Sequence, residues 1–268
     1  MLAYERCGAG EPVVLIHGIG HRRQAWSPVV DALAERYDVV LVDLPGHGDS
    51  PTGLLDSMSA KEALDAEFRV LFDHLGLDSA HLVGNSLGGL VALELAEAGL
   101  ARSVTALSPA GFWAGRLDFA YVQALFGSVM AVARVTQPIA PRILRSPVGR
   151  TAMLAWLMAR PWRVDPDQAA GDLRNLVATR ATLRGLLAQA YAFEPDLIHD
   201  VPVTVAWAGR DGVLLPYQAR RARTALHAAR HVRLPGCGHV PMSDDPALVV
   251  DAIVGTVEAA TAAGRRAA

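Results

Sequence analysis

Three side chains that lie far apart in the sequence could together form a nucleophile and its base. Ser86 lies in the segment Gly84-Asn85-Ser86-Leu87-Gly88, Asp211 follows it by 125 residues, and His239 follows Asp211 by 28 residues. A serine hydroxyl is a weak nucleophile until a histidine accepts its proton, and a carboxylate can hold that histidine in the useful orientation. These residue types predict that Ser86 is an activated nucleophile.

Each of the three residues also has an ordinary structural explanation. Ser86 could cap a helix in a packing turn, Asp211 could be a turn residue before Gly212, and a lone His239 could be structural. Their positions favour chemistry, because each residue comes shortly after an expected strand. The carboxyl ends of parallel strands meet at one edge of a sheet, so we expect these loops to build one site.

The glycines around Ser86 fit this interpretation. A strand that turns directly into a helix forces its central residue into a strained conformation, and small neighbours prevent a collision between strand and helix. Ser86 would then lie at a helix N-terminus, where backbone N–H groups favour developing negative charge.

Strand and helix patterns alternate over the first 110 residues. Short apolar runs at 12–18, 37–46, 80–84 and 103–111 predict buried strands, and helical patterns lie at 26–34, 59–75 and 87–98. Ser59 and Glu62 form a predicted capping box, and Gly76 ends that helix. The alternation returns with strands at 202–211 and 231–236 and helices at 216–227 and 246–260. This order predicts an α/β fold, a mostly parallel twisted sheet flanked by helices.

The alternation is interrupted between Gly111 and about His199, where prolines separate helical stretches and no strand pattern appears. We therefore expect an α/β core made of residues 1–110 and 200–268, with a helical cap inserted at 111–199. The cap would cover the active edge of the sheet. The final segment, Ala262 to Ala268, is expected to be frayed.

Five ordered segments resemble the motifs of α/β-hydrolase-fold serine hydrolases of the esterase-like kind. The segments are VVLIHGIG, LVDLPGHGDS, GNSLGG, WAGRDGVLLP and GCGHVPMSDDP. The resemblance implies that Ser86 attacks the substrate, that His239 transfers the proton and that Asp211 orients the imidazole. It also implies that the backbone N–H groups of Ile19 and Leu87 hold the oxyanion. His17 and His47 resemble family positions that hold loops together.

The cap segment is rich in large apolar residues, which predicts an apolar substrate pocket. The residues expected to line it are Asn85, Phe112, Trp113, Trp156 and Val240. The expected substrate is a small carboxylic ester, thioester or lactone with an apolar acyl or aryl part.

Three other functions stay open at this stage. Asn85 resembles the Gly-Asn-Ser elbow of meta-cleavage carbon–carbon bond hydrolases, but Ile19-Gly20-His21 and Val240 depart from that pattern. A cofactor-free perhydrolase fits the residues around Leu87 less well. A hydrolase-fold binding protein without catalysis is the third alternative.

Composition excludes several other classes. The chain has 268 residues, 51% of them hydrophobic and 19% charged, and a net charge of −2, which predicts no nucleic-acid partner. Cys7 and Cys237 are too few for a disulfide framework or a zinc site, and no metal or cofactor motif is present. The apolar region from Phe119 to Val135 falls short of the ~20 residues that span a bilayer, so no membrane span is expected.

The remaining expectations concern location, assembly and single residues. The N-terminus has charged residues where a signal peptide needs an apolar core, which predicts a cytoplasmic protein. A homodimer is one of the oligomeric states that the sequence allows. His21 is expected to be a solvated loop residue, with a position at the mouth of the pocket as the alternative, and Cys237 is expected to fill a small space in the packing.

Overall fold

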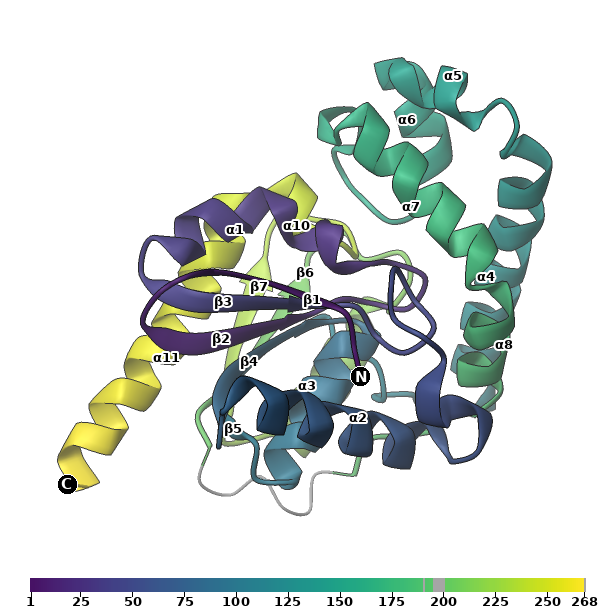
Figure 1. Cartoon of the computed structure of the whole chain (residues 1–268). Helices are drawn as coiled ribbons and strands as arrows, with labels where there is room; N and C mark the ends of the chain where they lie inside the picture. Colours follow the sequence, from purple (N-terminus) through teal and green to yellow (C-terminus); the bar gives the residue numbers. More distant parts are fainter. Residues whose placement is uncertain (190, 195–200, 268) are drawn as a thin grey trace.

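One seven-stranded sheet forms the centre of the molecule. The computed structural model describes residues 1–189, 191–194 and 201–267, and in them the strand order is β1-β3-β2-β4-β5-β6-β7 (Figure 1). The strands are β1 (Tyr4–Gly8), β2 (Glu11–Ile16), β3 (Tyr37–Val42), β4 (Ala80–Asn85), β5 (Ala101–Leu107), β6 (Val203–Ala208) and β7 (Arg230–Leu234). All neighbouring pairs are parallel except β1 and β3. The predicted mostly parallel α/β fold is confirmed.

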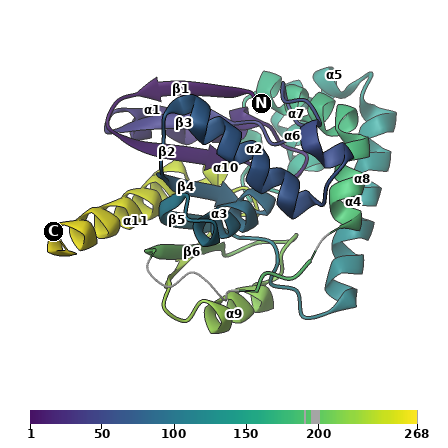
Figure 2. The ribbon, with the colours of Figure 1, turned by 60° about the horizontal axis from the view of Figure 1, so that its bottom comes forward.

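Helices cover both faces of the sheet, so the central strands are buried on both sides. Strands β3, β4 and β6 are buried along their whole length, which explains their continuous apolar runs. Helices α1 (Ser27–Ala34) and α11 (Pro246–Ala267) lie against one face, and α2 (Ala60–Leu75) and α3 (Leu87–Glu97) against the other (Figures 1 and 2). Two further helices, α9 (Pro216–Ala225) and the short α10 (Pro241–Asp244), flank β7 in sequence.

Strand β1 is the one described strand that the sequence patterns do not predict. It contains Glu5 and Arg6, and most of its residues are exposed or half-buried. Arg6 pairs with Asp38 of β3 at 2.6 Å. Charged side chains are common on edge strands because they prevent further strand pairing, and they also hide the alternating pattern by which a strand is recognised.

The helix boundaries test two finer predictions. The Ser59–Glu62 capping box begins α2, and Gly76 ends it in the left-handed conformation at φ 67°, as predicted. The last helix is longer than predicted, since α11 continues from Pro246 to Ala267 instead of ending near Ala260. Its final turns are rich in alanine, which favours helix even where few tertiary contacts hold it.

Five helices lie between β5 and β6 and form a separate layer beyond the carboxyl edge of the sheet (Figure 1). They are α4 (Arg116–Thr136), α5 (Ala140–Arg145), α6 (Pro147–Leu154), α7 (Pro166–Ala178) and α8 (Arg180–Ala188). No strand occurs in 111–189 or 191–194. The chain enters and leaves this layer side by side, because the Phe193 N–H donates to the Gly111 carbonyl at 2.9 Å. The predicted boundary between residues 199 and 200 lies outside the described residues.

Helix α4 corrects one expectation about length. Its 21 residues, and the span Pro246–Arg265 in α11, are long and apolar enough to cross a membrane by length and composition alone. The apolar region of the cap is therefore not too short for a span. In this structure α4 buries Val122, Phe126 and Met130 within the fold.

Candidate active site

Ser86 occupies a sharp turn between β4 and α3. Its backbone has φ 57° and ψ −116°, a conformation that side-chain-bearing residues seldom adopt. A Cβ added at Gly84 would lie 1.9 Å from the Gly88 carbonyl oxygen, and one at Gly88 would lie 2.1 Å from the Ile16 carbonyl oxygen. The glycines therefore permit a close approach of strand and helix. The Ser86 side chain makes no capping hydrogen bond to α3, so helix capping does not explain the serine.

His239 and Asp211 lie in contact at the ends of β7 and β6. The distance from His239 Nδ1 to Asp211 Oδ2 is 2.9 Å, and both side chains are buried. The other oxygen of Asp211 accepts the N–H groups of Val213 at 2.9 Å and Leu214 at 2.8 Å. The carboxylate is thus fixed by the loop that follows it, and its second oxygen fixes the imidazole.

The histidine loop is held by a residue that the sequence patterns do not single out, Asp244. This carboxylate is completely buried and accepts three backbone N–H groups, from Gly238 at 2.7 Å, Ala159 at 2.8 Å and Arg160 at 2.5 Å. Ala159 and Arg160 belong to the cap segment, so one side chain joins the cap to the loop that carries His239.

Asn85 also holds the loop that carries His239. Its amide nitrogen donates to the Leu107 carbonyl at 3.1 Å and to the His239 carbonyl at 2.9 Å. Both amide hydrogens are therefore used to hold backbone groups. Asn85 also contributes to the cavity wall next to Ser86.

Ile19 and Leu87 present backbone N–H groups beside Ser86. In the described part of the chain, neither N–H has a hydrogen-bond acceptor. The loop around Ile19 is fixed on both sides of that residue. His17 Nδ1 lies 2.8 Å from the Gly18 carbonyl, and the Gly20 N–H donates to His47 Nε2 at 3.0 Å.

His17 and His47 are neutral rings that hold loops together, as predicted. Each has its Nδ1 beside a carbonyl and accepts a backbone N–H at Nε2, from Leu44 for His17 and from Gly20 for His47. Burial lowers the pKa of His17 well below its ordinary value and lowers the pKa of His47 to about 4. The neutral state keeps both acceptors available.

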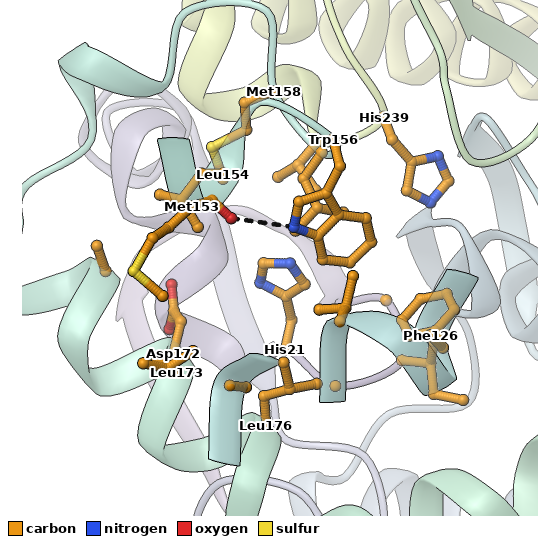
Figure 3. A pocket seen from close by; sticks show the side chains of 18 of the residues that line it. His21, Phe126, Met153, Leu154, Trp156, Met158, Asp172, Leu173, Leu176 and His239 are labelled. Atoms are coloured by element: carbon orange, nitrogen blue, oxygen red, sulfur yellow. Dashed lines mark hydrogen bonds between the residues drawn. The ribbon is translucent and has the colours of Figure 1, made fainter. Parts of the chain in front are cut away.

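A largely apolar cavity of about 300 Å³ opens in front of Ser86 and His239; we name it the large chamber. Its walls combine the loop that carries Ile19 with side chains of α4, α6, α7 and the segment after α6. Figure 3 shows Trp156 and His21 projecting into it, with Asp172 on one side and His239 and Phe126 on the other. The Trp156 ring stands edge-on to Phe126 at a centroid distance of 5.6 Å. Val240 also lines this chamber.

A second cavity, of about 60 Å³, shares Ile19, Ser86 and Phe126 with the first; we name it the small chamber. Trp113 lines it. Phe112 does not lie at either chamber. Its ring packs against Phe193 and Trp207, with centroid distances of 5.7 and 6.5 Å, so the expectation that it lines the substrate pocket is wrong.

His21 also departs from its predicted role. It lines the large chamber instead of standing in solvent, and its Nδ1 is buried without a hydrogen-bond partner. Burial lowers its pKa, so the ring is neutral. Its neighbour in the chamber wall, Asp172 of α7, accepts a hydrogen bond from Arg22 at 2.9 Å. Asp172 interrupts the apolar spacing of Ala169, Leu173 and Leu176, and this interruption is the signal by which it could have been found.

Cys237 is packed as predicted. The residue is fully buried, and burial raises the pKa of its thiol to about 11, which leaves it protonated and a poor nucleophile. Among the residues described, no group of three His, Cys, Asp or Glu side chains could hold a metal ion.

Comparison with known proteins agrees with this architecture. Residues 13–252 match the alpha/beta hydrolase family. An uncharacterized protein of Mycobacterium tuberculosis is 30% identical, over 94% of this chain and 76% of its own. The epoxide hydrolase EphH of the same species is 33% identical, over 69% of this chain and 89% of its own.

Solved structures show the same fold at lower identity. The enol-lactonase of Burkholderia xenovorans LB400 superposes with a TM-score of 0.74 at 21% identity, covering 96% of each chain. With the family matched over most of its length, the chain belongs to the alpha/beta hydrolase family and is a hydrolase of that kind.

Proposed function

We propose that this protein is a serine hydrolase that cleaves a carboxylic ester, thioester or lactone with an apolar part through an acyl-enzyme. The observation that carries the proposal is that His239, which contacts Asp211, lines the same cavity as Ser86. The Ser86 side chain does not cap helix α3. The apolar walls of both chambers support an apolar substrate.

The first half of the reaction would form the acyl-enzyme. Ser86 Oγ attacks the carbonyl carbon while His239 Nε2 accepts its proton, and Asp211 keeps the other ring nitrogen protonated. The N–H groups of Ile19 and Leu87 hold the oxyanion, a contribution worth on the order of 100- to 1,000-fold in rate per donor. The bond from the carbonyl carbon to the leaving group then breaks. His239 gives the proton to the departing atom, which is the oxygen of an alcohol or the sulfur of a thiol.

The second half would release the acid. Water enters the position that the alcohol has left, His239 takes its proton, and the resulting hydroxide attacks the acyl carbon. The bond from the carbonyl carbon to Ser86 Oγ breaks, and His239 returns the proton to the serine.

Epoxide opening, the reaction in the name of one relative, fits this site less well. A serine that opened an epoxide would form an ether, which has no carbonyl carbon for water to attack. An acyl-enzyme has one, so the serine at this position favours acyl transfer.

Two observations favour ester over carbon–carbon cleavage of an acidic dienoate. No Lys or Arg lies among the described residues that line the large chamber, so no side-chain cation is available for a carboxylate. Asn85, the residue that suggested this alternative, uses both amide hydrogens on backbone carbonyls.

The test is covalent labelling with a fluorophosphonate, followed by mass spectrometry of the labelled peptide. We expect one adduct on Ser86, none in the Ser86→Ala variant, and release of alcohol from p-nitrophenyl esters by the wild-type protein alone. A folded protein that stays unlabelled and turns over no ester would contradict the proposal and favour a binding protein. Loss of the absorbance of a meta-cleavage dienoate without ester turnover would favour carbon–carbon cleavage.

A further inference from the structure

Ser86 lies where the two chambers meet, and the chambers differ in size and in their relation to His239. The large chamber has a volume of about 300 Å³ and includes His239 in its wall. The small chamber has a volume of about 60 Å³, and among the described residues that line it His239 is absent. The small chamber is instead bounded by Leu87, Val213 and Leu214 beside the serine.

The proposed chemistry determines which part of the substrate enters which chamber. His239 must reach the leaving-group oxygen to protonate it, so the alcohol part lies on the side of the chamber that His239 lines. The acyl chain leaves the carbonyl carbon in a different direction, and the small chamber is the other space that opens at Ser86.

The walls of the two chambers differ in composition as well as in size. The Trp113 ring in the small chamber meets Phe119 at a centroid distance of 5.9 Å, and its Nε1 donates to the Tyr191 carbonyl at 2.9 Å. The large chamber is bordered by Met153 and Met158, whose unbranched side chains adapt to irregular shapes.

We propose that the preferred substrate is a short-chain acyl ester of a bulky apolar alcohol, with the alcohol in the large chamber and the acyl group in the small one. The proposal rests on the proposed serine-hydrolase function and adds the orientation of the substrate. The small volume limits the acyl chain, and the larger volume, bordered by Met153 and Met158, accepts alcohols of varied shape.

One helix provides a matched pair of variants. Val122, Phe126 and Val129 lie on one face of α4 at spacings of four and three residues. Val122 lines the small chamber, Val129 lines the large chamber, and Phe126 between them lines both. Replacing either valine by alanine removes the same two methyl groups, but from different chambers.

The first experiment compares isomeric esters that differ only in the direction of the ester group. Benzyl acetate and methyl phenylacetate contain the same atoms and have primary alcohol leaving groups of similar basicity. We expect kcat/KM for benzyl acetate to be at least about 10-fold higher, the size of effect that a change of a methylene or two in a pocket produces. We expect the same direction for 2-naphthylmethyl acetate against methyl 2-naphthylacetate.

The second experiment extends the acyl chain of benzyl esters from acetate to octanoate. In the wild-type protein kcat/KM should decrease as the acyl chain becomes longer. In Val122→Ala this decrease should begin at longer acyl chains. In Val129→Ala the dependence of kcat/KM on acyl chain length, the acyl profile, should be unchanged. Leu187→Ala, at a second position of the small-chamber wall, gives an independent test if Val122→Ala fails to fold. Faster turnover of the methyl esters, or an acyl profile that shifts with Val129→Ala alone, would overturn the orientation while leaving ester hydrolysis intact. An unlabelled Ser86 with no turnover of any ester would overturn the hydrolase function itself.

Discussion

At the scale of single residues, backbone carbonyls and N–H groups are the main partners of the side chains that surround the proposed nucleophile. Asn85 holds the His239 carbonyl, Asp211 accepts two N–H groups of its own loop, and Asp244 accepts three. A buried hydrogen bond to the backbone fixes a loop more strictly than apolar packing does, because its geometry is directional. The position of His239 relative to Ser86 therefore depends on side chains whose polar atoms are bound to the backbone.

Replacing Asn85 by alanine tests this dependence. Asn85→Ala removes the donor to the His239 carbonyl and one of two donors to the Leu107 carbonyl, which also accepts the Ser86 N–H at 3.0 Å. This loss should cost about 1–3 kcal/mol of unfolding free energy. Displacement of His239 should lower kcat for benzyl acetate by about 100-fold, with a smaller change in KM. Steady-state kinetics and urea unfolding give the two numbers.

Ser103 provides the control for that variant. Ser103 Oγ and His81 Nδ1 form another buried polar pair between β5 and β4, at 2.8 Å, remote from both chambers. Ser103→Ala should lose stability of similar size while retaining kcat. Equal losses of kcat in both variants would show that a general loss of stability, and not the position of His239, explains the effect.

The residues that could be predicted from the sequence are those next to a recognisable element. Ser86 and Asp211 each come shortly after a buried apolar strand, His239 follows the partly exposed strand β7, and the glycines around Ser86 mark the turn. Asp244 and the chamber residue Asp172 could not be predicted in the same way. Apart from Gly238, the partners of both carboxylates lie in distant segments, so the interrupted apolar spacing around Asp172 is the one local signal.

At the scale of elements, the loop that carries Ile19 is positioned by two buried histidines that must stay neutral. His17 and His47 each accept a backbone N–H at Nε2, and a protonated ring would present a donor at that point instead. Helices and strands with continuous or amphipathic apolar patterns were predictable, whereas this loop was recognised only by family resemblance. Its conformation depends on polar contacts between loops that carry no periodic signal.

A lower pH should therefore reduce the unfolding free energy, because it favours protonation of His17 and His47. The pKa of His47 is about 4 in the folded protein and about 6.5 in an unfolded chain, so between these values the unfolded chain binds a proton that the folded chain does not. Stability is then lost as the pH falls from about 6.5 towards 4, by up to about 1.4 kcal/mol per pH unit from this residue. Urea unfolding at several pH values in that window measures the slope.

His47→Gln isolates the contribution of this ring, because glutamine offers an acceptor oxygen for the Gly20 N–H without titrating. We expect the variant to lose less stability than the wild type as the pH falls. Parallel slopes in the two proteins would show that His47 does not titrate in this way.

At the scale of the whole molecule, the cap is part of the proposed active site and not only a cover. Its helices supply most of the large-chamber wall, and its side chains hold core loops in place. Asn175 of α7 is the most connected example. Its Oδ1 accepts the Gly48 N–H at 2.8 Å, and its Nδ2 donates to the Gly20 and His21 carbonyls at 3.0 and 2.9 Å. These contacts join the cap to the loop that carries Ile19.

Removing the Asn175 side chain should therefore affect catalysis, although Asn175 lines neither chamber. Asn175→Ala eliminates three hydrogen bonds at once, and we expect a loss of about 2–3 kcal/mol of unfolding free energy. Because the Ile19 N–H would no longer be held in position, kcat for benzyl acetate should fall by on the order of 100-fold, comparable with the loss of one oxyanion donor.

Gln168→Ala is the matched control on the same helix, since Gln168 makes one hydrogen bond to the Gln24 carbonyl at 3.0 Å. It should cost less stability and leave kcat close to the wild-type value. If Asn175→Ala lowered the unfolding free energy but kept kcat, the loop that carries Ile19 would be held by the core alone, through His17 and His47.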